Sequence, residues 1–243
     1  MQNGAEISKT PLLCAVESEN RLVVNFLLQQ NLIETNLKDA NGRCALSVAL
    51  LEKKDVILAE SLVNKGADVN TTLSDGDALV HSAVRTANLL ALQFLCANKA
   101  NVNLRNKEGL SALHLSILVH DFNGDVLRLI LKSGADVSVK TSQGGATALH
   151  LAVEKNAGPE IVNIIAEGKQ ALPLSSVDSN EDTPLARASL NGFLEVAKTL
   201  LKAGADINEK DRNGVTLLLR AIAAKNDETS VFLLNNGADA TAR

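Results

Sequence analysis

The sequence repeats itself with a period of 33 to 36 residues. A Gly-Ala-Asp motif occurs in NKGADVN, KSGADVS, KAGADIN and NNGADAT, and a degenerate copy reads NKANVN. The glycine position of the period recurs at intervals of 33, 35, 34, 36 and 33 residues, at Gly66, Lys99, Gly134, Gly168, Gly204 and Gly237. Such a period is typical of stacked supersecondary units, because a unit of this size cannot bury its apolar side alone.

A second motif follows the same period. Its copies are TPLLCAV from Thr10, CALSVAL from Cys44, ALVHSAV from Ala78, SALHLSI from Ser111, TALHLAV from Thr147, TPLARAS from Thr183 and TLLLRAI from Thr216. With these two motifs the sequence resembles the ankyrin-repeat family, from about Thr10 to Arg243. The resemblance implies an all-α solenoid of about seven helix–loop–helix repeats, joined by short hairpin-like turn loops.

Local chemistry agrees with this fold. Thr147 or Thr183 can cap the first helix of a repeat, and Gly204 can end the second helix because glycine tolerates a positive φ. Small alanines, such as Ala152, allow neighbouring first helices to approach closely. We therefore expect a single ankyrin-repeat domain over residues 1–243, with repeats at about 8–38, 39–72, 73–105, 106–140, 141–177, 178–210 and 211–243.

Charge and cysteine content limit the possible functions. The formal net charge is -4, which offers no broad basic surface for nucleic acid. Cys14, Cys44 and Cys96 each lie in an apolar helical pattern, so we interpret them as reduced, packed thiols of a cytoplasmic protein. No apolar run is long enough to span a membrane, and the sequence MQNGAEISKT does not resemble a signal peptide.

The sequence contains no recognisable catalytic or cofactor motif. His81, His114 and His150 occupy the histidine position of the second motif, where we expect each ring to bond to the backbone of a neighbouring loop. Metal binding is the less favoured interpretation, because consecutive repeats lie about 8–10 Å apart. Since HExxH, GxSxG, paired CxxC and phosphate-binding glycine motifs are also missing, we expect no enzyme, no metal and no cofactor.

The family resemblance implies a concave binding face, made of loop tips and the ends of the first helices. Carried onto this chain, the residues expected to contact a partner on that face are Arg43, Arg85, Arg105, Lys107, Lys140, Glu154, Lys210 and Arg212. The tips are more basic than a net charge of -4 suggests, so we expect an acidic peptide or acidic protein surface as the partner of a monomeric chain.

Two irregular positions add candidates. Leu73 replaces the polar residue of other loops, so it either lies under its own loop or is exposed for contact. Phe122 lies in an insertion of two residues in the fourth repeat, where it either fills a gap or projects toward a partner.

The resemblance therefore implies a non-catalytic scaffold for protein–protein interaction. The stretch Leu73–Leu95 resembles repeats of the endosomal ankyrin–FYVE trafficking proteins, so any attachment to endosomal membranes would come from regions outside this chain. The alternative is an adaptor that delivers an enzyme, such as a ubiquitin ligase or a phosphatase, to its substrate. Val231, Phe232 and Leu233 give the last repeat an internal character, which predicts further repeats beyond Arg243.

Overall fold

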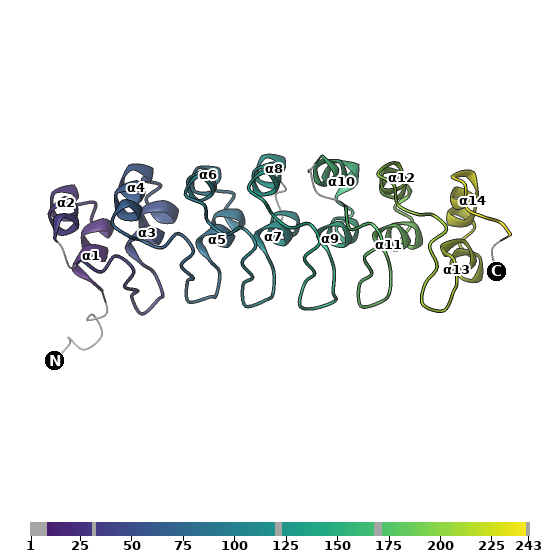
Figure 1. Cartoon of the computed structure of the whole chain (residues 1–243), viewed down its shortest axis with the longest axis horizontal. Helices are drawn as coiled ribbons and strands as arrows, with labels where there is room; N and C mark the ends of the chain where they lie inside the picture. The colour runs from purple at the N-terminus through teal and green to yellow at the C-terminus, as the bar shows by residue number, and fades with distance from the viewer. Residues whose placement is uncertain (1–8, 31–32, 120–122, 168–171, 242–243) are drawn as a thin grey trace. The chain divides into compact units, whose positions relative to one another are not determined.

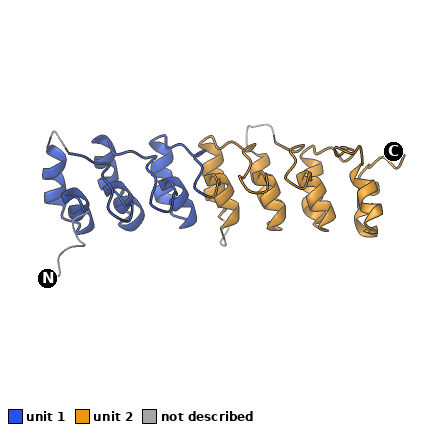
Figure 2. Ribbon diagram, turned by 90° about the horizontal axis from the view of Figure 1, so that it is seen from below, with its two compact units in different colours: residues 1–107 blue, residues 108–243 orange. Residues whose placement is uncertain are grey.

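The structure is a computed structural model that describes residues 9–30, 33–119, 123–167 and 172–241. Within these ranges the chain is helical, with two isolated antiparallel bridges and no strand. Its contacts divide it into two compact units, residues 1–107 and residues 108–243 (Figure 2). Each unit is a row of helix pairs that follow one another in chain order (Figure 1). The structure confirms the all-α repeat fold, whereas the single domain stays a prediction.

One helix of each pair, here called the inner helix, lies next to the loops (Figure 1). In unit 1 the inner helices are α1 (Pro11–Glu17), α3 (Ala45–Ser47) with its π-helical continuation η1 (Val48–Glu52), and α5 (Leu79–Arg85). In unit 2 they are α7 (Ala112–Leu118), α9 (Ala148–Glu154), α11 (Pro184–Leu190) and α13 (Leu217–Ala223).

The other helix of each pair is the outer helix. In unit 1 the outer helices are α2 (Arg21–Gln29), α4 (Val56–Asn64) and α6 (Leu89–Ala97). In unit 2 they are α8 (Gly124–Lys132), α10 (Gly158–Ala166), α12 (Leu194–Lys202) and α14 (Asp227–Asn235). None of the described helices is long and apolar enough to cross a lipid bilayer.

Two different hydrogen-bond arrangements occur at the start of the inner helices. The Thr183 hydroxyl accepts a hydrogen bond of 3.2 Å from the backbone N–H of Ala186, as the sequence predicted for a cap. Thr147 does not cap α9 in this way. Its hydroxyl lies 2.8 Å from Nδ1 of His150, which also accepts the backbone N–H of Thr147. A histidine at the third helical position therefore replaces the hydroxyl cap.

Helix packing within each unit follows the order of the chain. In unit 1, α1 contacts α3 and η1, and α4 contacts α6; in unit 2, α7, α9 and α11 contact in sequence, as do α8, α10 and α12. Small residues allow this close approach, since the inner-helix alanines are at most 1% exposed at Ala49, Ala83, Ala152, Ala188 and Ala221. Within each unit, the buried apolar side chains lie between consecutive helix pairs, as the repeat period predicted.

The outer helices α4, α6, α8, α12 and α14 are each followed by a residue in the left-handed conformation. Gly66 and Gly134 have φ values of 91° and 90°, where glycine pays no steric penalty. Lys99 takes the same place after α6 with a φ of 60°, so one repeat of unit 1 carries a side chain where its neighbours have none. Cys44 is buried as expected, but Cys14 is exposed and the interpretation of a packed thiol is wrong there.

Candidate functional site

Aspartate carboxylates hold three of the loops between repeats in shape; Asp39 and Asp178 are buried, and Asp211 is half-buried. Oδ1 of Asp39 accepts the backbone N–H groups of Asn41 at 2.9 Å and of Arg43 at 2.8 Å. Asp178 and Asp211 make the same two bonds to residues two and four positions further on. Because the carboxylate takes over donors that the tight turn leaves unpaired, it stabilises the turn in each of these three loops.

The histidines connect inner helices to the following loops. Nε2 of His81 donates to the backbone oxygen of Leu104 at 2.9 Å, and Nδ1 accepts the backbone N–H of Ala78 at 2.9 Å. Nε2 of His114 lies 3.0 Å from the oxygen of Val139. His150 bonds in the same way to the oxygen of Asp182 at 2.9 Å. The expected bonds to loop backbone are thus confirmed, and they need the neutral Nε2–H tautomer.

Burial favours the neutral form of two of these rings. It lowers the pKa of His81 and of His150, because a charged ring would lose its hydration between the packed repeats. The backbone acceptors oppose this shift without cancelling it. Within the described ranges, no three His, Cys, Asp or Glu side chains come together in a way that could hold a metal ion.

Arg43, expected at a loop tip, is surrounded by acidic groups. Its guanidinium lies 2.7 Å from Asp39, 2.7 Å from Glu17 and 3.3 Å from Glu52. Hydrogen bonding to Asp39 raises the pKa of Arg43 further above its usual value. Burial pushes the pKa of Asp39 upward, but the bonds from Arg43 outweigh it and the pKa lies below its usual range. Much of the Arg43 charge is therefore balanced inside unit 1.

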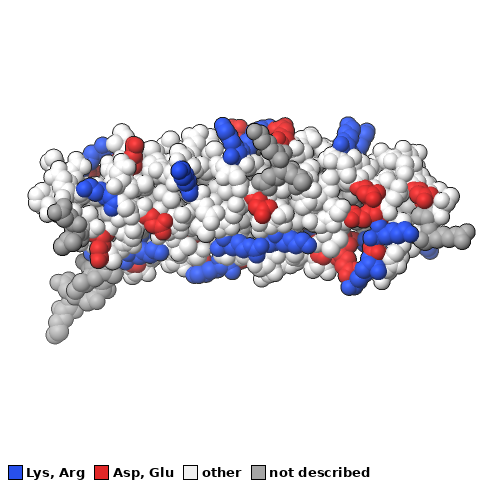
Figure 3. All heavy atoms as spheres, in the orientation of Figure 1, with Lys and Arg blue, Asp and Glu red and all other residues white. Residues whose placement is uncertain are grey.

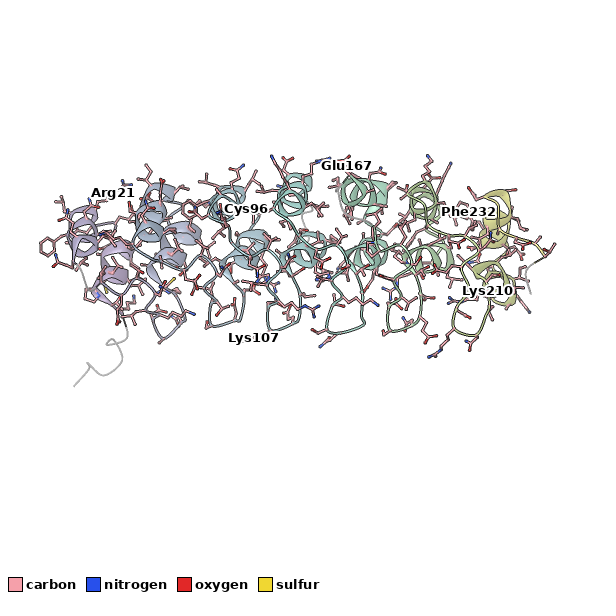
Figure 4. All side chains as sticks on the ribbon, in the orientation of Figure 1. Arg21, Cys96, Lys107, Glu167, Lys210 and Phe232 are labelled. Carbon is pink, nitrogen blue, oxygen red and sulfur yellow. The ribbon has the colours of Figure 1, made fainter. Side chains whose placement is uncertain are left out.

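Two of the expected lysines join neighbouring loops. Nζ of Lys107 donates to the backbone oxygen of Ser74 at 2.5 Å, and Nζ of Lys140 donates to that of Val177 at 2.7 Å. The methylene stem of Lys107 covers Gly76 so closely that a Cβ there would collide with it. Both lysines remain exposed, and Figure 4 shows Lys107 on the loop side of unit 1, away from the outer helices. A bonded carbonyl leaves the ammonium charge uncompensated.

The other expected residues differ in their surroundings. Nε of Arg85 donates to Asp77 at 2.6 Å, Glu154 lies 3.2 Å from Arg187, and Arg212 pairs with Glu181. Arg105 and Lys210 are exposed, and Leu73 is half-buried, between the two expected alternatives. Phe122 lies outside the described residues. Figure 3 shows the consequence in unit 2, where acidic groups lie beside the Lys and Arg side chains over α11 and α13.

A groove of about 490 Å³ lies on the loop side of unit 2. Its walls include Leu110 and Leu151, with Glu108, Glu154 and Arg187 as the charged groups. Sequence reasoning named Glu154 but missed Arg187, which bridges Glu154 and the buried Asp178.

A signal for this arginine exists in the second motif. Arg187 and Arg220 stand in TPLARAS and TLLLRAI at the register where Leu115 and Leu151 stand in sister copies. Arg220 also reaches an acidic partner, Asp182, at 2.6 Å.

These helix pairs, with loops bonded by aspartate and histidine, define a class of protein built from stacked helical repeats. A family model described as "Ankyrin repeats (3 copies)" matches residues 52–141, 80–172, 121–211 and 149–243, and the chain belongs to the ankyrin-repeat family. Ankyrin-repeat domains generally serve as protein-binding scaffolds and are typically non-catalytic.

Several curated proteins are similar in sequence. The chain is 30% identical over 174 residues to the "Nuclear factor NF-kappa-B p105 subunit" of Gallus gallus, covering 70% of this chain and 17% of that protein. It is 28% identical over 273 residues to "Rabankyrin-5" of Homo sapiens, covering 91% of this chain and 23% of that protein. The chain is also 27% identical to the "Transient receptor potential cation channel subfamily A member 1" of Homo sapiens, covering 96% of this chain and 24% of that protein. The chain thus spans about a quarter or less of the length of these relatives.

Solved structures share the fold. The ankyrin repeat domain of Bcl-3 superposes with a TM-score of 0.79 at 24% identity, covering 94% of this chain and all of that domain. The ankyrin repeat protein EF0377 gives a TM-score of 0.65 at 25% identity, over 79% of this chain and 96% of that one. At this identity the likeness to the Bcl-3 domain establishes the fold alone.

Proposed function

We propose that this chain is an interaction scaffold that binds a partner protein through loop tips and inner helices. The observation that supports this most is the loop backbone, held by buried Asp39 and Asp178, by half-buried Asp211 and by the histidine bonds. A surface that is ordered before binding loses little conformational entropy when a partner arrives. Charged tip side chains on such a backbone are suited to recognition.

The structure allows a narrower choice among the tips of unit 1. Arg43 is balanced by three carboxylates, whereas Arg105 is exposed and the Lys107 ammonium donates to a neutral carbonyl oxygen. We therefore assign the recognition of an acidic peptide or acidic protein surface to Arg105 and Lys107. Attraction between opposite charges would raise the association rate and would weaken with salt.

Intracellular membrane trafficking is the proposed setting. It is supported by the resemblance of Leu73–Leu95 to the ankyrin–FYVE proteins and by the 28% identity to Rabankyrin-5 over 91% of this chain. Membrane attachment would then be supplied by regions outside these repeats.

Affinity capture with quantitative mass spectrometry tests the proposal. The full chain, the variant Arg105→Glu/Lys107→Glu and the variant Lys65→Glu serve as baits in parallel. Lys65 is an exposed lysine at the end of the outer helix α4, so its variant changes charge away from the loops. We expect specific partners to be lost with the tip variant and retained with the Lys65 variant.

Binding of a captured partner is then measured against salt concentration. Charge reversal at two tip positions is expected to reduce the affinity by about tenfold or more at low salt, and by less at high salt. An identical capture profile for all three baits would contradict the role of the tips. Circular dichroism checks that each variant is folded.

A further inference from the structure

The outer helices of unit 1 expose apolar side chains in their first turn. The second residue of α2, α4 and α6 is Leu22, Ile57 and Leu90, with exposed fractions of 84%, 69% and 49%. We call these three residues the apolar ladder. Phe26 lies one turn after Leu22 on the same helix and is 64% exposed, which widens the apolar surface on α2.

The outer helices of unit 2 carry acidic residues in the same turn. These are Asp125 in α8, Glu160 in α10, Glu195 in α12, and Asp227 and Glu228 in α14, whereas α2, α4 and α6 have none. A negative charge there is favourable, because the first turn carries the positive end of the helix dipole. Leucine and isoleucine lack this favourable interaction with the helix dipole, and they leave apolar surface in water. Folding therefore does not explain the apolar ladder.

Contacts in unit 1 bring the first turns of these helices together. Arg21 at the start of α2 lies 2.7 Å from Asp55, the N-cap of α4. Ile57 and Leu90 line one groove of about 500 Å³, together with Arg21, Val24 and Leu58. Figure 4 shows Arg21 beside α2, on the side of unit 1 opposite to Lys107. The apolar ladder and the groove thus form one surface that is separate from the loop tips.

This surface carries a positive surplus. Arg21 is paired with Asp55, and Lys53 is paired with Glu19 at 2.9 Å. Lys54 also lines the groove, is exposed, and makes no ion pair within the described part of the chain. An acidic group at the edge of the groove would find an uncompensated partner in Lys54.

We propose that the apolar ladder and its groove bind an amphipathic α-helix of a partner protein, with apolar residues at seven-residue intervals and an acidic residue opposite Lys54. Seven residues of an α-helix advance about 10 Å, which matches the helix-packing distance of about 8–10 Å between neighbouring repeats. A partner helix that crosses α2, α4 and α6 would therefore place one apolar side chain against each residue of the apolar ladder. The groove beside Ile57 and Leu90 receives the bulkier side chains.

A second copy of this chain is the less suitable occupant. Symmetrical pairing of two apolar ladders would bring Lys54 of one copy toward the same positively charged groove of the other. Such pairing would add like charges to the interface, whereas an acidic helix neutralises them.

A display library of helical peptides of about 20 residues provides the probe, with the full chain as the selection target. The test variant is Leu22→Glu/Ile57→Glu/Leu90→Glu, which gives unit 1 the first-turn charge that unit 2 already has. Selected peptides are synthesised, and their affinities for both proteins are measured by fluorescence anisotropy. The matched control variant is Asp125→Leu/Glu195→Leu, which changes the same helix position in unit 2.

We expect selected peptides with apolar residues every seven positions and net negative charge. They should bind the test variant at least about tenfold more weakly and the control variant unchanged. Lys54→Glu should also weaken binding, and Arg105→Glu/Lys107→Glu should leave it unchanged, which separates this surface from the loop-tip function.

Three results would overturn the proposal. The first is a selection that yields no peptide with the seven-residue spacing, and the second is equal binding to the test variant. The third is a dimer of the unmodified chain in analytical ultracentrifugation that Leu90→Glu dissociates, because a second copy would then be the occupant.

Discussion

The outer helices of the two units agree on their buried side and differ on their exposed side. In α6 of unit 1, Leu92 is fully buried, and in α8 of unit 2, Leu127 at the same register is also fully buried. Two residues earlier, α6 exposes Leu90, whereas α8 carries Asp125. The position that packs against the neighbouring repeat is thus kept apolar, while the position that faces water varies between units.

This difference separates two demands on a repeat protein. The buried residue of each outer helix contributes to the interface with the next repeat, so its substitution changes stability. The exposed residue of the first turn contributes little to that interface and is available for recognition. Substitutions at matched positions of the two units can measure each demand separately.

Truncation of a buried leucine should have the largest effect on the free energy of unfolding, and the effect should be similar in both units. Leu92→Ala and Leu127→Ala are each expected to lower the free energy of unfolding by about 2–5 kcal/mol, because each leaves a cavity between packed helices. Leu90→Ala should change it by less than about 0.5 kcal/mol. Urea unfolding followed by circular dichroism measures these values, since the chain has no Trp or Tyr. A large loss with Leu90→Ala would remove the distinction between the two positions.

Substitution of the left-handed residue that follows an outer helix should have the second largest effect on the free energy of unfolding. A Cβ added at Gly66 in unit 1 or Gly134 in unit 2 meets no atom within 4 Å, so backbone strain alone opposes a side chain there. Gly66→Val and Gly134→Val should each cost about 1–2 kcal/mol. Lys99→Gly should raise the free energy of unfolding by about 1 kcal/mol, because glycine relieves the strain of this conformation. A neutral result for either valine variant would show that its helix does not end in this conformation.

Acidification should weaken both units through their buried histidines. Unfolded histidine has a pKa of about 6.5, and burial lowers the pKa of His81 and His150 in the folded chain. The unfolded state therefore takes up protons first, and the free energy of unfolding should fall as the pH decreases from about 7.5 to about 5.5. Most carboxylates stay ionised in both states over that range.

Urea midpoints measured across this pH range, with NMR titration of the two rings, check the expectation. Ring resonances that titrate at the pKa of free histidine would contradict it. A shifted titration in only one of the two rings would show that the units differ in their cores as well as at their surfaces.

Substitutions in the first turn of the outer helices should have the smallest effect on the free energy of unfolding. Leu22→Glu, Ile57→Glu and Leu90→Glu should each raise the free energy of unfolding by about 0.3–1 kcal/mol through the helix dipole. Glu195→Leu in unit 2 should lower it by a similar amount. Thermal unfolding at low salt gives the sharpest measurement, because salt screens this interaction. Destabilisation by Leu90→Glu would indicate that the apolar ladder packs within the chain.

The fold could be predicted because its determinants are local and recur. Caps such as Thr183, left-handed glycines such as Gly134, and the apolar spacing of each helix recur with the period, and each constrains only a few neighbouring residues. Thr147 shows the limit of this reasoning, since its hydroxyl bonds to His150 and does not cap the helix. Here a side chain one turn away changed the role of a residue that the motif alone could not distinguish.

The candidate binding residues were harder to predict, because their state depends on other repeats. Arg43 looked like an available basic tip, but Glu17 comes from the preceding repeat and Glu52 from the following π-helix. Arg187 was missed although its register is visible, because only its contact with Asp178 and Glu154 gives it a role in the groove.

The sequence by itself determined the repeat period, the helical class, the helix ends and the histidine bonds to the loops. The reason is that these features depend on residues within one repeat or on a single backbone group of the next. Only the tertiary structure decided which charges are compensated and which apolar side chains remain in water. Those properties arise where residues about 30 positions apart meet, as Arg21 meets Asp55 beside the apolar ladder.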